Sequence, residues 1–222
     1  MVSHIGPLAV SANLRGTVEE ALAAAIVSGE LGPGELLTAP TLGARFGVSA
    51  TPVREAMLNL QKRGFVEAVR NKGFRVTEVS EQDLWEIVRL RQLLEVPPMR
   101  DIARTIQPAS CAELRVKADL IVRSAEAADI PTYLDADVDF HLTLLKLTGN
   151  RRLVEMVRDL RQQTRMVGLV NMIGTEELAR SAVEHHHLMD RLEQGDGRGA
   201  EQLMHAHIEH VLGWWNGRVE RD

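Results

Sequence analysis

The chain of 222 residues is 45% apolar and 26% charged, a composition that excludes extended disorder. No apolar run approaches the roughly 20 residues that cross a bilayer, and residues 1–14 lack the features of a signal peptide, so we expect a cytoplasmic protein without a membrane partner. The single Cys111 excludes an internal disulfide and a cysteine-rich zinc site. Any metal ion must therefore be held by His, Asp or Glu.

The net charge of −5 conceals two regions of different chemistry. Residues 1–79 carry 8 Lys and Arg against 7 Asp and Glu, whereas residues 80–222 carry 18 against 24. Within residues 45–75 the count is 7 basic side chains against 2 acidic ones, and seven of the eight histidines lie beyond residue 140. We therefore predict two domains, residues 1–79 and 80–222.

Three helices are predicted in the first domain. Thr17 and Glu20 form a capping box that begins a helix ending near Gly29. After a turn rich in glycine and proline, a short helix covers about residues 38–46, and a third helix follows an N-cap at Ser49. The second and third helices have the order and spacing of a helix-turn-helix.

A β-hairpin follows the third helix. Residues 65–70 and 74–79 are short β-prone runs, and the Asn71-Lys72-Gly73 stretch between them supplies the residues of a tight turn. Three helices and a hairpin within 80 residues predict a winged helix-turn-helix.

The second domain shows helical signals only. Ser80 with Asp83 and Ser110 with Glu113 resemble capping boxes at helix starts, and the Pro97-Pro98 pair should kink or split the first helix. We expect a protein that is mainly α, with the winged helix-turn-helix followed by an all-α antiparallel bundle of about six helices, near residues 81–106, 110–128, 131–147, 151–172, 176–193 and 198–218.

The third helix has the properties of a DNA recognition helix. With Val53, Met57 and Leu60 turned inward, Thr51 and Arg54 lie on the outer face, and Arg54 has the geometry to bind a guanine edge in the major groove. Lys72 at the hairpin tip suits contact with phosphate. A solvated basic face of a protein-interaction domain is the alternative, but the order of helix, turn, helix and wing favours duplex DNA.

Four ionisable side chains share the apolar faces of three predicted helices. Asp137 and His141 lie four residues apart in the stripe of residues 131–147, and His185 and His207 lie in the stripes of the last two helices. An unpaired buried polar group costs about 1–3 kcal/mol of folding free energy. Four such groups on the apolar faces of three helices therefore indicate that they share one binding partner.

We predict that this partner is a divalent metal ion. A ligand set of one Asp and three His suits zinc above all, and the same chemistry also suits nickel or manganese. Four protein ligands leave coordination positions of the metal ion open for a carboxylate ligand. The alternative is that each histidine satisfies a local carbonyl group. Helical phase puts the neighbouring His186, His187 and His205 outside the cluster, and His210 is ambiguous.

Arg91 lies in the apolar stripe of residues 81–106, with Glu95 one turn later. Two roles are open for it: a salt bridge with Glu95, or binding of the carboxylate of an effector, for which the planar guanidinium is suited.

The first domain closely resembles the N-terminal domain of GntR-family bacterial transcription regulators. The resemblance covers about 65 residues and rests on SGEL at 28–31, PG at 33–34, GVS at 47–49, TPVREA at 51–56 and the wing glycine. It implies DNA-contacting roles for Ser49, Thr51, Arg54, Lys72 and Gly73. Many relatives carry Arg where this chain has Ala50, so we expect a somewhat different operator.

Residues 80–218 resemble the FCD effector domain of the FadR-like subfamily. The matching elements are LRQLLE at 90–95, DVDFH at 137–141, GN at 149–150, EH at 184–185 and HAHI at 205–208. The ligand pattern of that family falls on Asp137, His141, His185 and His207, the residues that helical phase selects independently. Two residues of these matching elements, Arg91 and Asn150, are predicted to bind the effector.

Together these features predict a homodimeric, ligand-responsive regulator that binds a palindromic operator in double-stranded DNA. The resemblance implies a repressor whose effector is a small carboxylate metabolite. One alternative is a metal-dependent, hydrolase-like enzyme that uses the Asp/His₃ site to activate water. Another is constitutive DNA binding with a purely structural metal ion. We expect no enzyme, because the sequence offers no further carboxylate as general base.

Overall fold

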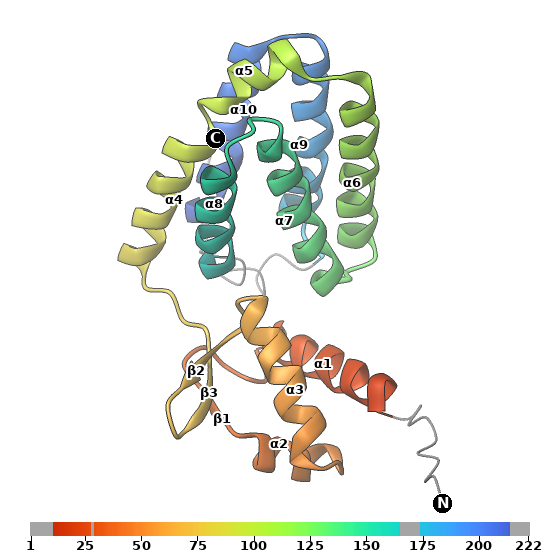
Figure 1. Ribbon diagram of the computed structural model, residues 1–222, viewed down its shortest axis with the longest axis vertical. Coiled ribbons are helices and arrows are strands. Elements are labelled where there is room, and N and C mark those ends of the chain that lie inside the picture. Colours follow the sequence, from red (N-terminus) through yellow and green to blue (C-terminus); the bar gives the residue numbers. More distant parts are fainter. Residues whose placement is uncertain (1–10, 28, 165–173, 214–222) are drawn as a thin grey trace, which may run out of the picture. The chain divides into compact units, whose positions relative to one another are not determined.

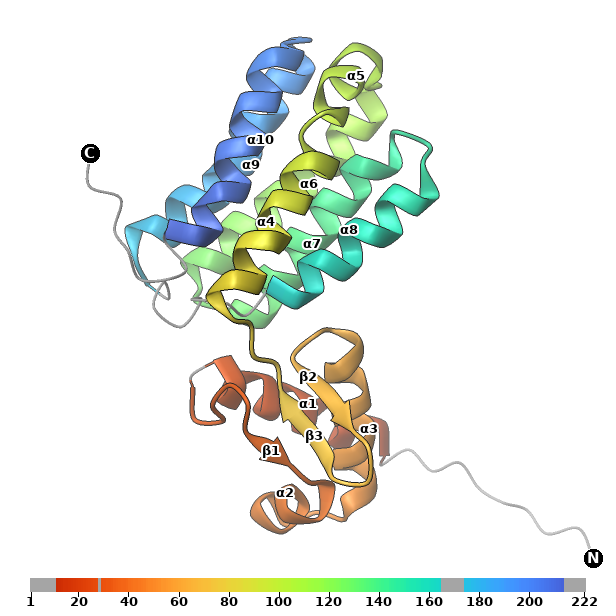
Figure 2. The same cartoon turned by 90° about the vertical axis from the view of Figure 1, so that its left-hand side faces the viewer.

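The computed structural model describes residues 11–27, 29–164 and 174–213, which form two compact units that meet in the sequence between Glu78 and Val79 (Figures 1 and 2). The predicted fold class is confirmed, since the chain is mainly helical with a small sheet in its first unit. Among the described residues, no helix has both the length and the apolarity required to cross a membrane.

The N-terminal unit contains three helices and a three-stranded antiparallel sheet. Its elements in chain order are α1 (Ser11–Val27), β1 (Leu36–Leu37), α2 (Ala39–Phe46), α3 (Ala50–Lys62), β2 (Val66–Val69) and β3 (Gly73–Val76). The sheet order is β1-β3-β2, with Leu36 opposite Arg75 and Val66 opposite Val76. The core contains Leu22 of α1, Met57 and Leu60 of α3, and Phe65.

Two features of this unit differ from the sequence prediction. The first helix begins at Ser11, so Thr17 lies inside it and is not an N-cap. The strand β1 was not predicted, because it is only two residues long and follows a turn rich in glycine and proline.

Glycine is required at the start of β3. Gly73 has φ +122°, and a Cβ atom there would lie 2.3 Å from the carbonyl oxygen of Leu37 in β1. The close approach of the two strands therefore excludes any side chain at this position.

The C-terminal unit is a bundle of helices. They are α4 (Glu81–Glu95), α5 (Pro98–Thr105), α6 (Pro108–Glu126), α7 (Ile130–Lys146), α8 (Arg151–Thr164), α9 (Glu176–Glu193) and α10 (Gly197–Gly213). Helix α6 packs on α7 and α9, α8 packs on α4 and α7, and α10 packs on α4, α5 and α9. Tyr133 and Phe140 of α7 and Met189 of α9 are buried between them.

The six predicted segments of this unit correspond to seven helices among the described residues. Pro97 and Pro98 divide the predicted segment 81–106 into α4 and α5, because proline cannot donate the hydrogen bonds of a helix interior. Ser80 caps α4 as expected, by accepting a hydrogen bond from the amide of Asp83, but α6 begins at Pro108 and so Ser110 is not a cap. The predicted ends at residues 172 and 218 lie outside the described residues.

Candidate metal centre and DNA-reading surface

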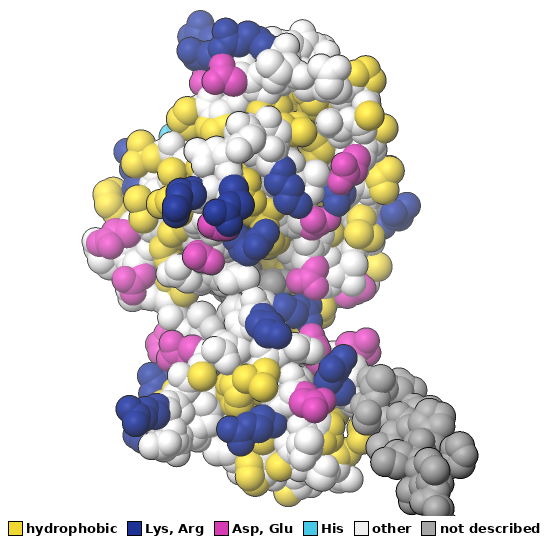
Figure 3. Space-filling model, viewed as in Figure 1, with side chains coloured by type: hydrophobic (Ala, Val, Ile, Leu, Met, Phe, Trp, Pro, Cys, Tyr) yellow, Lys and Arg dark blue, Asp and Glu magenta, His cyan; other side chains and the backbone are white. Residues whose placement is uncertain are grey.

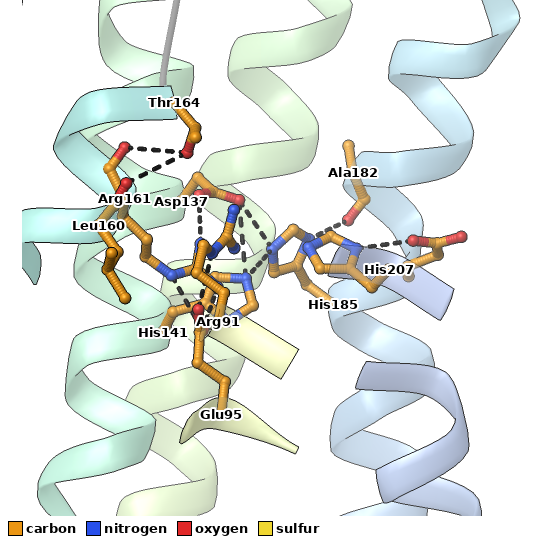
Figure 4. A network of polar contacts seen from close by, with 11 residues as sticks. Arg91, Glu95, Asp137, His141, Leu160, Arg161, Thr164, Ala182, His185 and His207 are labelled. Carbon is orange, nitrogen blue, oxygen red and sulfur yellow. Dashed lines mark hydrogen bonds and ion pairs between the residues drawn. The ribbon is translucent and has the colours of Figure 1, made fainter. Parts of the chain in front are cut away.

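Three helices bring the four predicted ligands together in the C-terminal unit (Figure 4). Asp137 and His141 come from α7, His185 from α9 and His207 from α10, and one ligand atom of each lies within 4.8 Å of the others. His141 and His185 are each only 1% exposed, while Asp137 and His207 are partly buried. Figure 3 draws one face of the protein, and almost no histidine is visible on that face.

The atoms at the centre of the cluster are all suited to binding a cation. The Nε2 atoms of His141 and His185 lie 3.1 Å apart, and Asp137 Oδ1 lies 3.2 Å from His185 Nε2 and 3.7 Å from His141 Nε2. The rings of His141 and His207 are stacked, with centroids 5.2 Å apart.

In two of the histidine rings, Nδ1 donates a hydrogen bond to an acceptor outside the cluster. His185 Nδ1 donates to the carbonyl oxygen of Ala182 at 3.1 Å, and His207 Nδ1 donates to Glu184 Oε2 at 2.7 Å. In a neutral ring the remaining Nε2 then carries a lone pair, and that of His185 faces the carboxylate of Asp137. Acceptors that face one another are stabilised by a hydrogen-bond donor or a cation placed between them. This is the arrangement of metal-binding histidines, whose other ring nitrogen donates to a carboxylate or a carbonyl group.

Burial favours the neutral form of His141 and His207. Burial and the positive charge of Arg161 lower the pKa of His141 well below its ordinary value, and burial lowers the pKa of His207, an effect that Glu184 partly offsets. Burial alone would raise the pKa of Asp137, but the neighbouring histidines and the Arg161 guanidinium, which donates to its Oδ2, hold that pKa well below its ordinary value. The cluster therefore offers imidazole nitrogens and one carboxylate, a donor set that fits a divalent transition metal ion.

Glu184 forms the outer boundary of the cluster. Its Oε1 lies 3.3 Å from His210 Nδ1, in addition to the contact with His207. Burial would raise the pKa of Glu184, but these two histidines lower it to about 2. The carboxylate is thus ionised over the whole physiological range and fixes the tautomer of His207.

Arg91 is buried and lies beside Glu95, as the first of its two predicted roles requires. Its Nε donates to Glu95 Oε1 at 2.8 Å, within α4. Arg161 of α8 joins the same carboxylate to the cluster, since its Nε donates to Glu95 Oε2 and its Nη1 to Asp137 Oδ2, both at 3.0 Å.

Sequence reasoning missed Arg161. The signal was nonetheless present, because Val154, Val157, Arg161 and Thr164 form the buried stripe of α8 at spacings of three and four. An arginine in an apolar stripe is the anomaly that singled out Arg91, and the same argument applies here.

Asn150 lies apart from the cluster. Its side-chain oxygen accepts a hydrogen bond from the amide of Leu153 and so caps α8, and Arg161 lies about 16 Å further along that helix at a rise of about 1.5 Å per residue. Outside the cluster, His186 lies 3.2 Å from Asp119, whereas His187 and His205 are exposed. The structure therefore brings together the four predicted ligands and Arg91, but not Asn150.

Helix α3 presents the predicted DNA-reading residues to solvent. Val53, Met57 and Leu60 are fully buried, whereas Thr51 and Arg54 are exposed, in agreement with the predicted inner and outer faces. Ser49 is exposed at the N-cap position, and its side chain makes no capping hydrogen bond. Its hydroxyl is thus available to another partner.

The basic side chains of the N-terminal unit differ in whether they form ion pairs. Arg45 pairs with Glu30 at 2.7 Å and Arg63 pairs with Glu19 at 2.9 Å. Arg54, Arg70 and Lys72 are exposed and have no ion pair within the described part of the chain. The recognition helix and the hairpin tip therefore both present basic side chains that have no ion pair in the described part of the chain.

An exposed recognition helix beside a β-hairpin defines the class of winged-helix DNA-binding transcription regulators. The chain belongs to the gntR family of bacterial regulatory proteins, in the branch that carries an FCD domain: residues 14–76 match the gntR family and residues 86–210 match the FCD domain. FCD domains are known for metal binding, and the Asp/His cluster is a possible site of this kind.

Similar proteins are also transcription regulators. The Nta operon transcriptional regulator of Aminobacter aminovorans is 29% identical over 185 residues, which cover 82% of this chain and 85% of that protein. The regulator McbR of Escherichia coli K12 is 28% identical over 189 residues, covering 84% and 86%. The solved structure of E. coli McbR/YncC has a TM-score of 0.63 at 26% identity and covers 95% of both chains. The chain is therefore a DNA-binding regulator, and the enzyme alternative is rejected.

Proposed function

We propose that the protein is a homodimeric, ligand-responsive repressor whose residues 1–79 bind a palindromic operator and whose residues 80–222 bind a divalent cation and a small carboxylate effector. The observation that carries the proposal is the convergence of Asp137, His141, His185 and His207 within 4.8 Å inside the FCD domain.

The DNA contacts follow from the exposed surface of α3 and the hairpin. Arg54 donates to a base or phosphate in the major groove, Ser49 and Thr51 contact the backbone near the start of the helix, and Lys72 neutralises a phosphate. Gly73 acts indirectly, because its lack of a side chain lets β3 approach β1 and so sets the position of the wing.

The cation would be held by the four cluster residues, with zinc favoured by the His-rich ligand set. A bound divalent cation would supply a Lewis-acidic centre for the carboxylate of a small organic acid. Arg161 fixes the orientation of Asp137, and Glu184 and Ala182 fix the tautomers of His207 and His185. We also retain Arg91 and Asn150 as predicted effector contacts, although Arg91 is engaged by Glu95 and Asn150 caps α8.

The proposal is tested with chelator-treated protein and a fluorescent duplex that the protein selects from a random-sequence library. We expect a panel of small carboxylic acids to contain at least one member that raises the melting temperature of zinc-loaded protein and weakens its binding to the duplex. Protein without zinc should not respond to that acid. An acid response that is the same with and without zinc would contradict the cation-dependent part, and failure to select any duplex would contradict the operator part.

A further inference from the structure

A chain of buried ion pairs connects α4 to the candidate cation site (Figure 4). Arg91 and Arg161 hold the two oxygens of Glu95, and Arg161 also holds Asp137 of the cation site. Glu95 is fully buried, and the two arginines are each 4% exposed. Because buried charges are tolerated only when they are paired, each member of this chain constrains the position of the next.

The chain joins helices that pack directly on one another. Helix α4 lies beside α8, as Figures 1 and 2 both show, and α8 packs on α7. Glu95 belongs to α4, Arg161 to α8 and Asp137 to α7. One guanidinium therefore binds a carboxylate on each of two other helices.

His141 also lies close to α4, but it makes no hydrogen bond with that helix. Its Nδ1 is buried and has no hydrogen-bond partner among the described residues, and Glu95 Oε2 lies 3.9 Å from it, too far for a hydrogen bond. The other two histidines of the cluster already donate from Nδ1 to an acceptor. Only His141 lacks the outer partner that metal-binding imidazoles have.

We propose that Glu95 is the outer partner of His141 and couples the cation site to α4. Once Nε2 of His141 is committed to a cation, its Nδ1 must carry the hydrogen, and a small movement closes the gap to Glu95. Asp137 then shares its charge with the cation, so Arg161 depends more strongly on Glu95. Both changes hold α4 more firmly in the C-terminal unit. This inference rests on the proposed cation site.

Helix α4 is the first helix after the N-terminal unit in the sequence. The N-terminal unit ends at Glu78, and α4 begins three residues later at Glu81. The segment that leaves the DNA-binding unit thus runs directly into the helix that carries Glu95.

Hydrogen–deuterium exchange of the full chain, with and without saturating Zn²⁺ alone, tests the inference. In the wild type, exchange should slow in α7 and α9, which carry ligands, and also in α4, by a factor within the 5–150-fold range typical of coupled sites. If α7 and α9 are protected but α4 is not, the coupling is refuted while the cation site stands. If zinc does not bind at all, the proposed function itself fails.

Two variants separate coupling from binding. Glu95→Gln keeps the shape of the side chain but removes its charge, and Arg161→Gln removes the bridge to Asp137. Both should bind zinc when it is in excess, with an affinity reduced about 10–100-fold. Neither should slow exchange in α4 on zinc binding, although α7 and α9 respond. An α4 response equal to that of the wild type in Glu95→Gln would overturn the inference.

Arg115→Gln is the matched control. Arg115 of α6 also bridges helices by donating to Asp190 and Glu193 of α9, but it belongs to no part of the Glu95 chain. This variant should lose an interhelical ion pair at a more exposed position and still show the zinc-dependent protection of α4. Loss of that protection in Arg115→Gln would mean that any weakened bundle behaves in this way, which would also contradict the specific role of Glu95.

Discussion

The two candidate sites of this protein use charge in opposite ways. On the N-terminal unit, Arg54, Arg70 and Lys72 stand in solvent without an ion pair in the described residues. In the C-terminal unit, Arg91, Glu95 and Arg161 are almost completely buried and satisfy one another. An exposed charge loses little hydration free energy and can attract a separate partner such as DNA. A buried charge requires a permanent partner within the protein, and the pair fixes the relative positions of the two side chains.

This difference predicts how each site responds to change. Removal of an exposed basic side chain should weaken DNA binding without affecting stability. Removal of a buried group, or a change in its protonation, should affect stability and cation binding together. The following predictions test that division, from the largest expected effect to the smallest.

Arg54→Ala should cause the largest loss of operator affinity. A bidentate base contact contributes about 1–3 kcal/mol, and a dimer makes the contact twice, so affinity should fall at least about 30-fold in fluorescence anisotropy. The melting temperature should not change, because the side chain is exposed. Arg123→Ala, an exposed arginine of α6, is the control and should bind the duplex normally. Unchanged affinity of Arg54→Ala would remove α3 as the reading element.

Gly73→Ala should destabilise the N-terminal unit by about 3 kcal/mol, because the new Cβ meets the Leu37 carbonyl and φ is positive. Gly47→Ala is the control. Gly47 also has a positive φ, of +66°, but a Cβ there meets no described atom within 4 Å, so only about 1 kcal/mol of backbone strain is expected. Urea unfolding measures both. Equal losses would show that the contact with β1 is unimportant.

Acidification should destabilise the cation-free protein. Burial lowers the pKa of His141 and of His207 in the folded protein, so on acidification the unfolded chain binds protons first, near the ordinary histidine pKa of 6.5. Stability should therefore be present above pH 6.5 and fall below it, by up to about 1.4 kcal/mol per pH unit for each histidine.

The pH effect is checked by urea unfolding between pH 5 and 8 with a chelator present. His141→Gln should flatten the pH dependence, whereas His187→Gln, at an exposed position, should leave it unchanged. Stability that is constant or increases toward pH 5 would show that these imidazoles are not buried in the neutral form.

Lys72→Ala should have the smallest effect. Loss of one phosphate contact per protomer should lower affinity about threefold to tenfold and reduce the salt dependence of binding by about one counterion per site. The loss should be the same for all duplex sequences, unlike that of Arg54→Ala. A loss confined to one sequence would indicate base reading by the wing.

The sequence predicted the buried cluster better than its surroundings. Asp137, His141, His185 and His207 were identifiable because a polar residue in an apolar stripe is conspicuous at helical spacing. Glu184 and the contact of Arg161 with Glu95 depend on how α8, α9 and α10 pack, and helical phase within one segment does not reveal which helices become neighbours.

The errors at helix ends have local causes. The Thr17–Glu20 and Ser110–Glu113 pairs resemble capping boxes but lie inside α1 and α6, because a capping pattern does not prevent a helix from beginning earlier. Strand β1 depends on pairing with β3, from which it is separated by more than 30 residues, and two residues carry no periodic signal.

Metal content per chain tests the central claim most directly. Full-length protein, dialysed against zinc and then against zinc-free buffer, should retain about one zinc ion per chain by elemental analysis, since four ligands form one site. The double variant His185→Ala/His207→Ala should retain none, while His187→Ala/His205→Ala, which changes exposed histidines only, should match the wild type. Stoichiometric zinc in the first double variant, or none in the wild type, would contradict the account.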